Sequence, residues 1–211
     1  MKEVLMCIQP YWVFLIIARI MGWKIDKEKT IEVRKSFPKD QDWNRNVKIY
    51  CSKNEKSFKR IPKEYQPLME KFLGEVIGEF VCEDIQAVNS KCSDCGIDLF
   101  YHDCKTKGCL TESEVDKYFN IPKDKDLRVM KGNGFAWRIS DLKIYDKPKE
   151  LSEFYIFDSD KRRPSVDCEY KKRGFSHDWC LQTDNRFCNE LLCDKKRIKR
   201  PPQSWCYVEE L

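Results

Sequence analysis

The chain has 211 residues, of which 36% are charged and 13% aromatic, and its formal net charge is +5 at pH 7. These values suit a packed globular protein of one domain with appendages or two small domains, and they exclude collagen-like, low-complexity and wholly disordered chains. The charge is uneven, because residues 158–200 hold 12 Lys or Arg against 8 Asp or Glu. A local basic surface suits a polyanion such as nucleic acid, although mixed solubilising charge is the alternative interpretation.

The first predicted elements are a strand and a core helix. The opening KEVLMCIQP favours a short apolar strand, and Pro10 ends it and suits the first turn of a helix. Residues 11–21 are apolar on nearly every face, so this helix must be covered on most sides. The run is too short to span a bilayer and contains Arg19. We therefore expect no signal peptide or membrane anchor, a cytoplasmic location, and cysteines that are thiols or metal ligands rather than disulfides.

The middle of the chain contains three further β-prone runs and one helix signal. TIEVRK (30–35) and NVKIYCS (46–52) are short strands, and GEVIGEFVCEDI (74–85) alternates as a half-buried strand does. Its Val76, Gly78, Phe80 and Cys82 share one face, and Glu75, Glu79 and Glu83 lie on the other. Thr111, followed three residues later by Glu114, predicts a helix start with a capping box.

The last part contains more strands and an irregular segment. Residues 135–146, FAWRISDLKIYD, predict a strand pair or a bulged strand that ends at the turn residues DKPK, and SWCYVEEL (204–211) predicts a closing strand. Residues 158–200 lack periodicity and are rich in charge and Cys. Because strands and helices do not alternate regularly, we predict an α+β, mainly β fold, a small mixed barrel with flanking helices and a Cys-rich irregular insertion.

The strand within EKTIEVRK (28–35) has two unlike faces. Ile31 and Val33 point one way, and Thr30, Glu32 and Arg34 point the other, because side chains alternate along a strand. A solvated edge strand with a surface ion pair between Glu32 and Arg34 has the same pattern. Alternation alone therefore leaves open whether the polar face is an edge or a site.

The order IQPYW, apolar helix, Gly22, KTIEVRK, VKIYCS and GEVIGEF resembles the ASCH family of the PUA-like superfamily, and ISDLKIYDKPKELSEF and RPPQSWCYVEEL resemble its small, uncharacterised bacterial and phage members. Lys29, Glu32 and Arg34 match the family's G-x-K-x-x-E-x-R segment, except that six residues separate Gly22 from Lys29, where the family usually has one. The resemblance implies a PUA-like barrel over residues 1–157 and a closing barrel strand over 201–211. Between them, residues 158–200 form the predicted basic Cys-rich insertion, for which zinc is a candidate stabiliser.

The resemblance also implies a cleft between the first helix and the strands that takes single-stranded nucleic acid, such as RNA, or a modified nucleotide. Arg34 and Lys35 suit phosphate or a base edge, and Glu32 suits an exocyclic amine. Thr30 offers a hydroxyl, and the long stem of Lys29 reaches the cleft from the end of the strand. Stacking on bases would fall to Trp12 and Trp205, with Trp137 as a third candidate, although core packing is the alternative for each.

Two other function classes stay open. Some small bacterial members of the family that the sequence resembles are amidohydrolases on acetylated cytidine, but Glu32 occupies the position of their Thr nucleophile, so we favour binding over catalysis. If the chain is an enzyme, Lys29 and Glu32 are the catalytic candidates of a hydrolase acting on RNA or a modified nucleoside. The third alternative is a protein-interaction module that uses the Cys-rich insertion. The oligomeric state is open.

Four of the 12 cysteines, Cys7, Cys51, Cys82 and Cys206, lie in predicted strands as small core residues. The other eight form two local groups that are candidate structural Zn²⁺ sites, because zinc would supply folding energy that polar segments lack. Free thiols and disulfides are the alternatives. The first candidate set is Cys168, Cys180, Cys188 and Cys193, with His177 nearby, and the second is Cys92, Cys95, Cys104 and Cys109, with His102 nearby.

Overall fold

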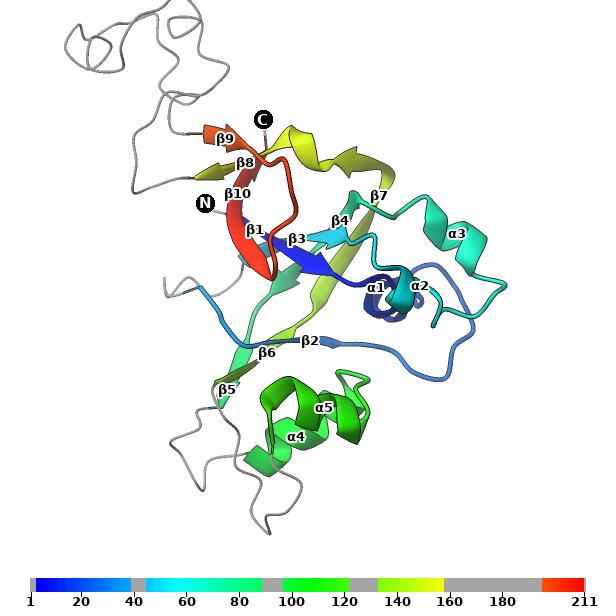
Figure 1. Ribbon diagram of the computed structural model, residues 1–211, viewed down its shortest axis with the longest axis vertical. Helices are drawn as coiled ribbons and strands as arrows, with labels where there is room; N and C mark the ends of the chain where they lie inside the picture. The colour runs from blue at the N-terminus through cyan, green and yellow to red at the C-terminus, as the bar shows by residue number, and fades with distance from the viewer. Residues whose placement is uncertain (1–2, 39–44, 89–96, 122–132, 158–194, 211) are drawn as a thin grey trace, which may run out of the picture.

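A computed structural model describes residues 3–38, 45–88, 97–121, 133–157 and 195–210. Within them the strands form two sheets (Figure 1). The larger sheet has β1 at its centre, paired parallel with β3 and antiparallel with β10. In spatial order its strands are β7 (Ser140–Glu150), β4 (Glu75–Cys82), β3 (Arg45–Cys51), β1 (Glu3–Ile8), β10 (Trp205–Glu210), β8 (Phe154–Phe157) and β9 (Lys195–Arg197).

The smaller sheet has the order β2 (Ile31–Arg34), β6 (Gly134–Arg138) and β5 (Ile85–Val88), with both pairs antiparallel. In the described ranges β2 and β5 pair only with β6, and the larger sheet ends at β7 and β9, so neither sheet closes. The α+β, mainly β prediction is confirmed, and no closed barrel is found within this part of the chain. The chain instead crosses from the smaller to the larger sheet between β6 and β7, and the sheets pack on each other through Phe135 and Trp137.

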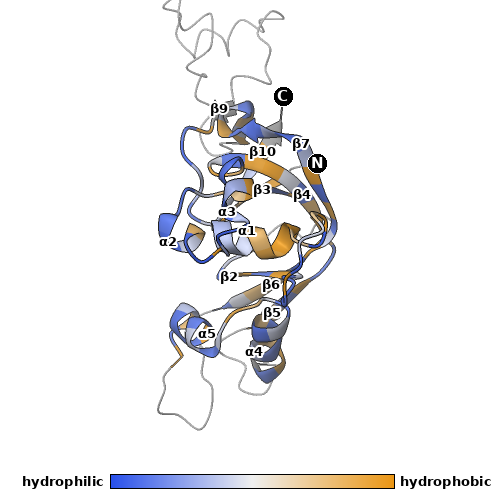
Figure 2. Cartoon of the chain, turned by 90° about the vertical axis from the view of Figure 1, so that its right-hand side faces the viewer, coloured by the Kyte–Doolittle hydropathy of each residue, from blue (hydrophilic) through white to orange (hydrophobic). Residues whose placement is uncertain are grey.

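The predicted core helix is present as α1 (Pro10–Ile17), which packs on the larger sheet and is hydrophobic along much of its length (Figure 2). The turn that follows α1 ends in a Schellman motif at Gly22, which has φ +66°. The Gly22 N–H donates to the Arg19 carbonyl at 3.1 Å, and the Trp23 N–H donates to the Ala18 carbonyl at 2.9 Å. Glycine at this position lets the last carbonyls of the turn be satisfied without the steric cost that a Cβ would bring.

Within the described ranges, four other α-helices flank the sheets. Two short ones, α2 (Glu55–Phe58) and α3 (Gln66–Glu70), lie on the side of α1, and α4 (Ile97–Thr106) and α5 (Glu112–Phe119) cover the outer face of the smaller sheet (Figures 1 and 2). A 3-10 helix at Leu151–Glu153 precedes β8. None of the helices in the described ranges is both long enough and apolar enough to cross a membrane.

The start of α5 and the final strand follow the sequence prediction, whereas residues 146–149 do not. The predicted capping box is confirmed: Thr111 Oγ1 accepts from the Glu114 N–H at 3.2 Å, and the Thr111 N–H donates to Glu114 Oε2 at 2.8 Å. The predicted final strand is confirmed as β10. The turn expected at DKPK is wrong, because β7 continues through these residues to Glu150 and pairs there with β4.

Candidate nucleic-acid interface

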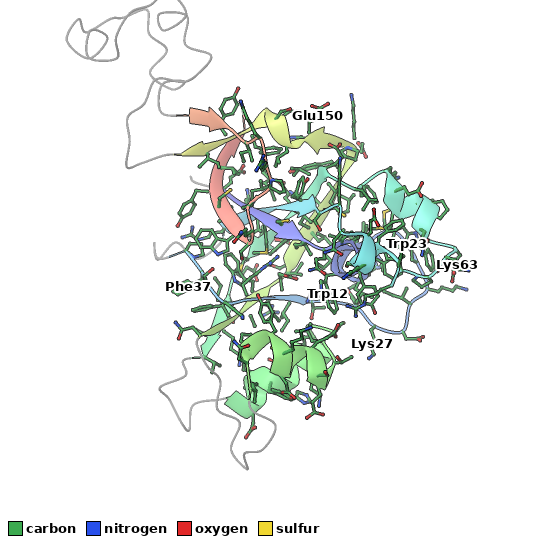
Figure 3. All side chains as sticks on the ribbon, viewed as in Figure 1. Trp12, Trp23, Lys27, Phe37, Lys63 and Glu150 are labelled. Carbon is green, nitrogen blue, oxygen red and sulfur yellow. The ribbon has the colours of Figure 1, made fainter. Side chains whose placement is uncertain are left out.

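The candidate site is a cleft of about 540 Å³ between the α1–α2 side of the larger sheet and the α5 side of the smaller one, with β2 at its base. Figure 3 shows Trp12 between α1 and β2. The lining is predominantly cationic, with five Lys or Arg against two Glu among the described residues. These charged lining residues are Lys29, Arg34, Lys35, Arg60, Lys117, Glu32 and Glu114.

Strand β2 is buried on both faces, so its polar face is not a solvated edge. Ile31 and Val33 pack into the core beneath α4 and α5, and each is 6% exposed. Glu32 is 5% exposed and lies opposite Trp137 of β6 in the sheet register. A carboxylate at this depth requires charged or hydrogen-bonding partners, because an isolated buried charge is costly.

Two cations supply those partners. Arg34 Nη2 lies 3.0 Å from Glu32 Oε1 and donates to the Cys7 carbonyl at 2.7 Å. Lys29 Nζ lies 3.5 Å from Glu32 Oε2 and donates to the Gly108 carbonyl at 2.8 Å. We call Lys29, Glu32 and Arg34 the charged triad. It connects β2 to β1 and to the loop before α5.

Lys29 reaches the triad because β2 begins only at Ile31. Alternation extended back to residue 29 groups Lys29 with Ile31, but the backbone before β2 is not a strand. There the Lys29 N–H donates to the Leu15 carbonyl at 3.2 Å, and the Thr30 N–H donates to the Lys107 carbonyl at 2.9 Å. Lys29 is consequently 3% exposed and faces Glu32, and Thr30 is exposed and outside the cleft lining.

Three buried polar atoms of the lining have no hydrogen-bond partner within the described ranges: Glu32 Oε2, Arg34 Nε and Ser52 Oγ. A buried polar atom costs about 1–3 kcal/mol when nothing replaces its lost water, a cost that the ion pair with Lys29 partly offsets for Glu32 Oε2. Glu32 Oε2 is an acceptor, Arg34 Nε is a donor, and the serine hydroxyl is both. The cleft thus presents complementary donors and acceptors to a ligand.

The structure brings only some of the predicted aromatic residues to the cleft. Trp12 lines it, with Lys29 Nζ 5.2 Å and Arg60 Cζ 4.7 Å from its ring centroid. Trp205 does not line it, and its Nε1 donates to Ser36 Oγ at 3.0 Å. Trp137 is completely buried in the core between the sheets.

Several lining residues were missed by sequence reasoning. Arg60, Lys117 and Tyr118 line the walls of the cleft around β2 and were not predicted. Lys35, which was predicted, also lines the cleft, and its Nζ lies 4.8 Å from the Tyr118 ring centroid. The capping box located the start of α5, which carries Lys117 and Tyr118, but nothing in its sequence indicated that this helix faces the cleft. Arg60 follows a helix too short to have been predicted.

The two titratable groups of the lining with shifted pKa values are both kept neutral. Burial raises the pKa of the Cys7 thiol above its usual value, against the opposing effect of Arg34, and burial raises the pKa of the Tyr118 hydroxyl in the same way. Cys7 is therefore a thiol at neutral pH rather than a reactive thiolate.

Most of the described cysteines are core residues. Cys7, Cys51, Cys82 and Cys206 lie in strands as predicted, where Cys51 and Cys82 are buried, but Cys206 and Cys7, which lines the cleft, are half-buried. Cys104 and Cys109 are buried. Burial raises the pKa of Cys104 to about 12. No group of three or more potential metal ligands is found within the described ranges. The other predicted zinc ligands, Cys92, Cys95, Cys168, Cys180, Cys188 and Cys193, lie outside these ranges, as does His177, so both zinc sites stay predictions.

No protein-family model and no curated protein matches this chain. It is similar to crystal structures of an ASCH protein from Zymomonas mobilis. The structure of this ASCH protein has a TM-score of 0.47 and 15% sequence identity to the present chain, and the match covers 99% of this chain and 88% of that one. The structure of its Tyr-to-Phe mutant has a TM-score of 0.49 and 14% identity, and the match covers 99% of this chain and 91% of that one.

Proposed function

We propose that this chain binds single-stranded nucleic acid, RNA in particular or a modified nucleotide, and that one nucleotide unit enters the cleft with its base against the charged triad. The observation that carries the proposal is the set of three buried lining atoms that have no hydrogen bond within the described ranges, beside an excess of cations. A nucleobase edge carries donors and acceptors side by side, which is what Glu32 Oε2 and Arg34 Nε lack.

Charge and size support the same ligand. Five cationic side chains against two carboxylates attract a polyanion, and their effect falls with salt. A volume of about 540 Å³ is within the usual range for a small-molecule site and accommodates a nucleotide rather than a duplex. Trp12 and Tyr118 offer rings for stacking, which favours unpaired bases.

The test is a titration of labelled single-stranded RNA and DNA, followed by fluorescence anisotropy at two salt concentrations. We expect Arg34→Ala to weaken RNA binding at least tenfold, because it removes the donor that faces the base. Lys63→Ala is the matched control, since Lys63 is exposed and outside the cleft lining and its loss changes the net charge equally. Equal affinities for the two variants would contradict the assignment of the site.

Arg34 is also structural, so a second variant protects the test from misfolding. Lys35 is exposed, and its Nζ lies over the Tyr118 ring. Lys35→Ala should therefore fold normally and still weaken RNA binding several-fold. Thermal unfolding of each variant separates lost binding from lost structure.

A second candidate function is hydrolysis of RNA or of a modified nucleoside. The 3.5 Å distance between Lys29 Nζ and Glu32 Oε2 favours it, because an amine and a carboxylate in contact can exchange a proton. Mass spectrometry after incubation with RNA and a panel of modified nucleosides distinguishes the two functions, because only an enzyme leaves product. The interaction-module alternative concerns residues 158–200, most of which lie outside the described ranges, and it stays a prediction.

A further inference from the structure

Arg60, which follows α2, contacts both walls of the cleft. Its Cζ lies 4.0 Å from the ring centroid of Tyr11 and 4.7 Å from that of Trp12, both on α1. Its Nη1 lies 2.9 Å from Glu114 Oε1 on α5. The α1–α2 wall and the α5 wall are therefore joined across the cleft by one guanidinium.

Neither partner needs this ion pair for its place in the fold. Glu114 belongs to the capping box of α5 through its other oxygen, because Oε2 accepts from the Thr111 N–H at 2.8 Å and from Thr111 Oγ1 at 3.0 Å. Arg60 lies outside the hydrophobic clusters, and its side chain is 39% exposed. The side chain of Glu114 is 30% exposed, so water screens the pair and it stabilises the fold only weakly.

The chemistry of Arg60 fits a phosphate. A guanidinium presents a planar fork of N–H donors that matches two phosphate oxygens, and its stacking on aromatic rings keeps that fork in place. Arg60 also lines the same cleft as the charged triad, together with the unpartnered Ser52 hydroxyl. Because the Arg60–Glu114 ion pair is partly exposed, an anion that the guanidinium binds more tightly, such as a phosphate, can readily displace the carboxylate.

We propose that Arg60 binds the phosphate of the nucleotide whose base lies against the charged triad, and that Glu114 holds the guanidinium until this phosphate displaces it. The inference rests on the proposed function. It adds Arg60 on the α1–α2 wall as the phosphate-binding residue and Glu114 on the α5 wall as the carboxylate that competes with the phosphate. The two carboxylates of the cleft then have different roles: Glu32 faces the base, and Glu114 regulates the phosphate contact.

The test is the ratio of affinities for a nucleoside monophosphate and for its nucleoside, measured by calorimetry with the 5′- and 3′-monophosphates of each of the four RNA bases. In the wild type we expect at least one monophosphate to bind about tenfold more tightly than its nucleoside. Arg60→Ala should lower this ratio to below about twofold. Lys59→Ala, which removes the adjacent exposed charge outside the cleft lining, should leave it unchanged.

Glu114→Gln tests the competition, because glutamine retains the capping-box acceptor and removes the charge. We expect it to raise the phosphate ratio about threefold, while Glu112→Gln in the same helical turn leaves the ratio unchanged. The cleft also contains Lys117, which pairs with no acidic residue in the described ranges. A ratio that falls in Lys117→Ala and persists in Arg60→Ala would assign the phosphate to Lys117 and overturn the proposal.

The outcomes separate this inference from the proposed function. If RNA binds the wild type and depends on Arg34, but no monophosphate binds better than its nucleoside, the role of Arg60 is wrong and the interface holds. A lower ratio in Glu114→Gln would likewise contradict the competition. If no nucleoside, monophosphate or RNA binds the wild type, the proposed function itself fails.

Discussion

Substituting Glu32 should destabilise the protein far more than substituting a glutamate in an exposed ion pair. The Glu32 side chain is 6% exposed, and its two partners, Lys29 and Arg34, are 2% and 11% exposed. Glu32→Ala leaves two buried cations without their carboxylate, and breaking a buried ion pair in this way costs about 3–5 kcal/mol. We expect about 3 kcal/mol, because Lys29 and Arg34 each keep a carbonyl acceptor.

The measurement is urea unfolding at pH 7, followed by tryptophan fluorescence, with thermal unfolding in parallel. For a chain of this size 3 kcal/mol corresponds to a fall in Tm of roughly 6–12 °C. Glu28→Ala is the control, because Glu28 lies 3.6 Å from Arg19 and their side chains are 41% and 79% exposed. It should cost about 0.5 kcal/mol or less.

Equal stability of Glu32→Ala and Glu28→Ala would refute the reasoning, because it would mean that the triad's cations are adequately solvated without the carboxylate. A further variant separates burial from charge. Replacing Lys29 and Arg34 by Met and Glu32 by Leu removes the desolvation penalty, so it should recover most of the stability lost in Glu32→Ala. It should not recover RNA binding.

The remaining predictions concern three sites outside the triad. Burial raises the pKa of the Glu79 carboxyl, but the hydrogen bond from Lys48 outweighs this effect, so the pKa is lowered. The stability that the lowered pKa supplies is present above the unfolded-state pKa of about 4.3 and is lost as the pH falls through the folded-state pKa. The stability difference between wild type and Glu79→Gln should therefore narrow below pH 4 in acid-unfolding curves. Gly22→Ala should cost about 1 kcal/mol in urea unfolding, because its φ is +66° and no atom lies within 4 Å of the added Cβ to offset the strain. Thr111→Ala should also cost about 1 kcal/mol through loss of the cap, and Thr111→Ser should restore it.

Local signals in the sequence predicted most of the elements. Pro10 and the all-apolar run located the core helix, and the Thr111 capping box located α5, because both depend on neighbours within one turn. The pairing of strands into two open sheets was not predictable, since it depends on contacts between residues far apart in the chain. The separation of β6 from β7 into different sheets is the clearest case.

Strand alternation predicted part of the site. Glu32 and Arg34 share a face as alternation requires, whereas Lys29, which the motif and its long stem placed at the cleft, joins them because the backbone before Ile31 is not a strand. Sequence also did not separate Trp12 in the cleft from Trp137 in the core, because a tryptophan suits either position. Arg60 reaches the α1–α2 wall of the cleft only through tertiary packing, which the sequence pattern does not show.

The position of β1 has a consequence for synthesis of the chain. This strand lies between β3, which follows soon after it in the chain, and β10, which the ribosome makes much later. One edge of β1 therefore has no native partner until β10 has been made, and such an unpaired apolar edge favours aggregation. Completion of the larger sheet awaits β10, so we expect nascent chains that lack it to depend on chaperones more than the folded protein does.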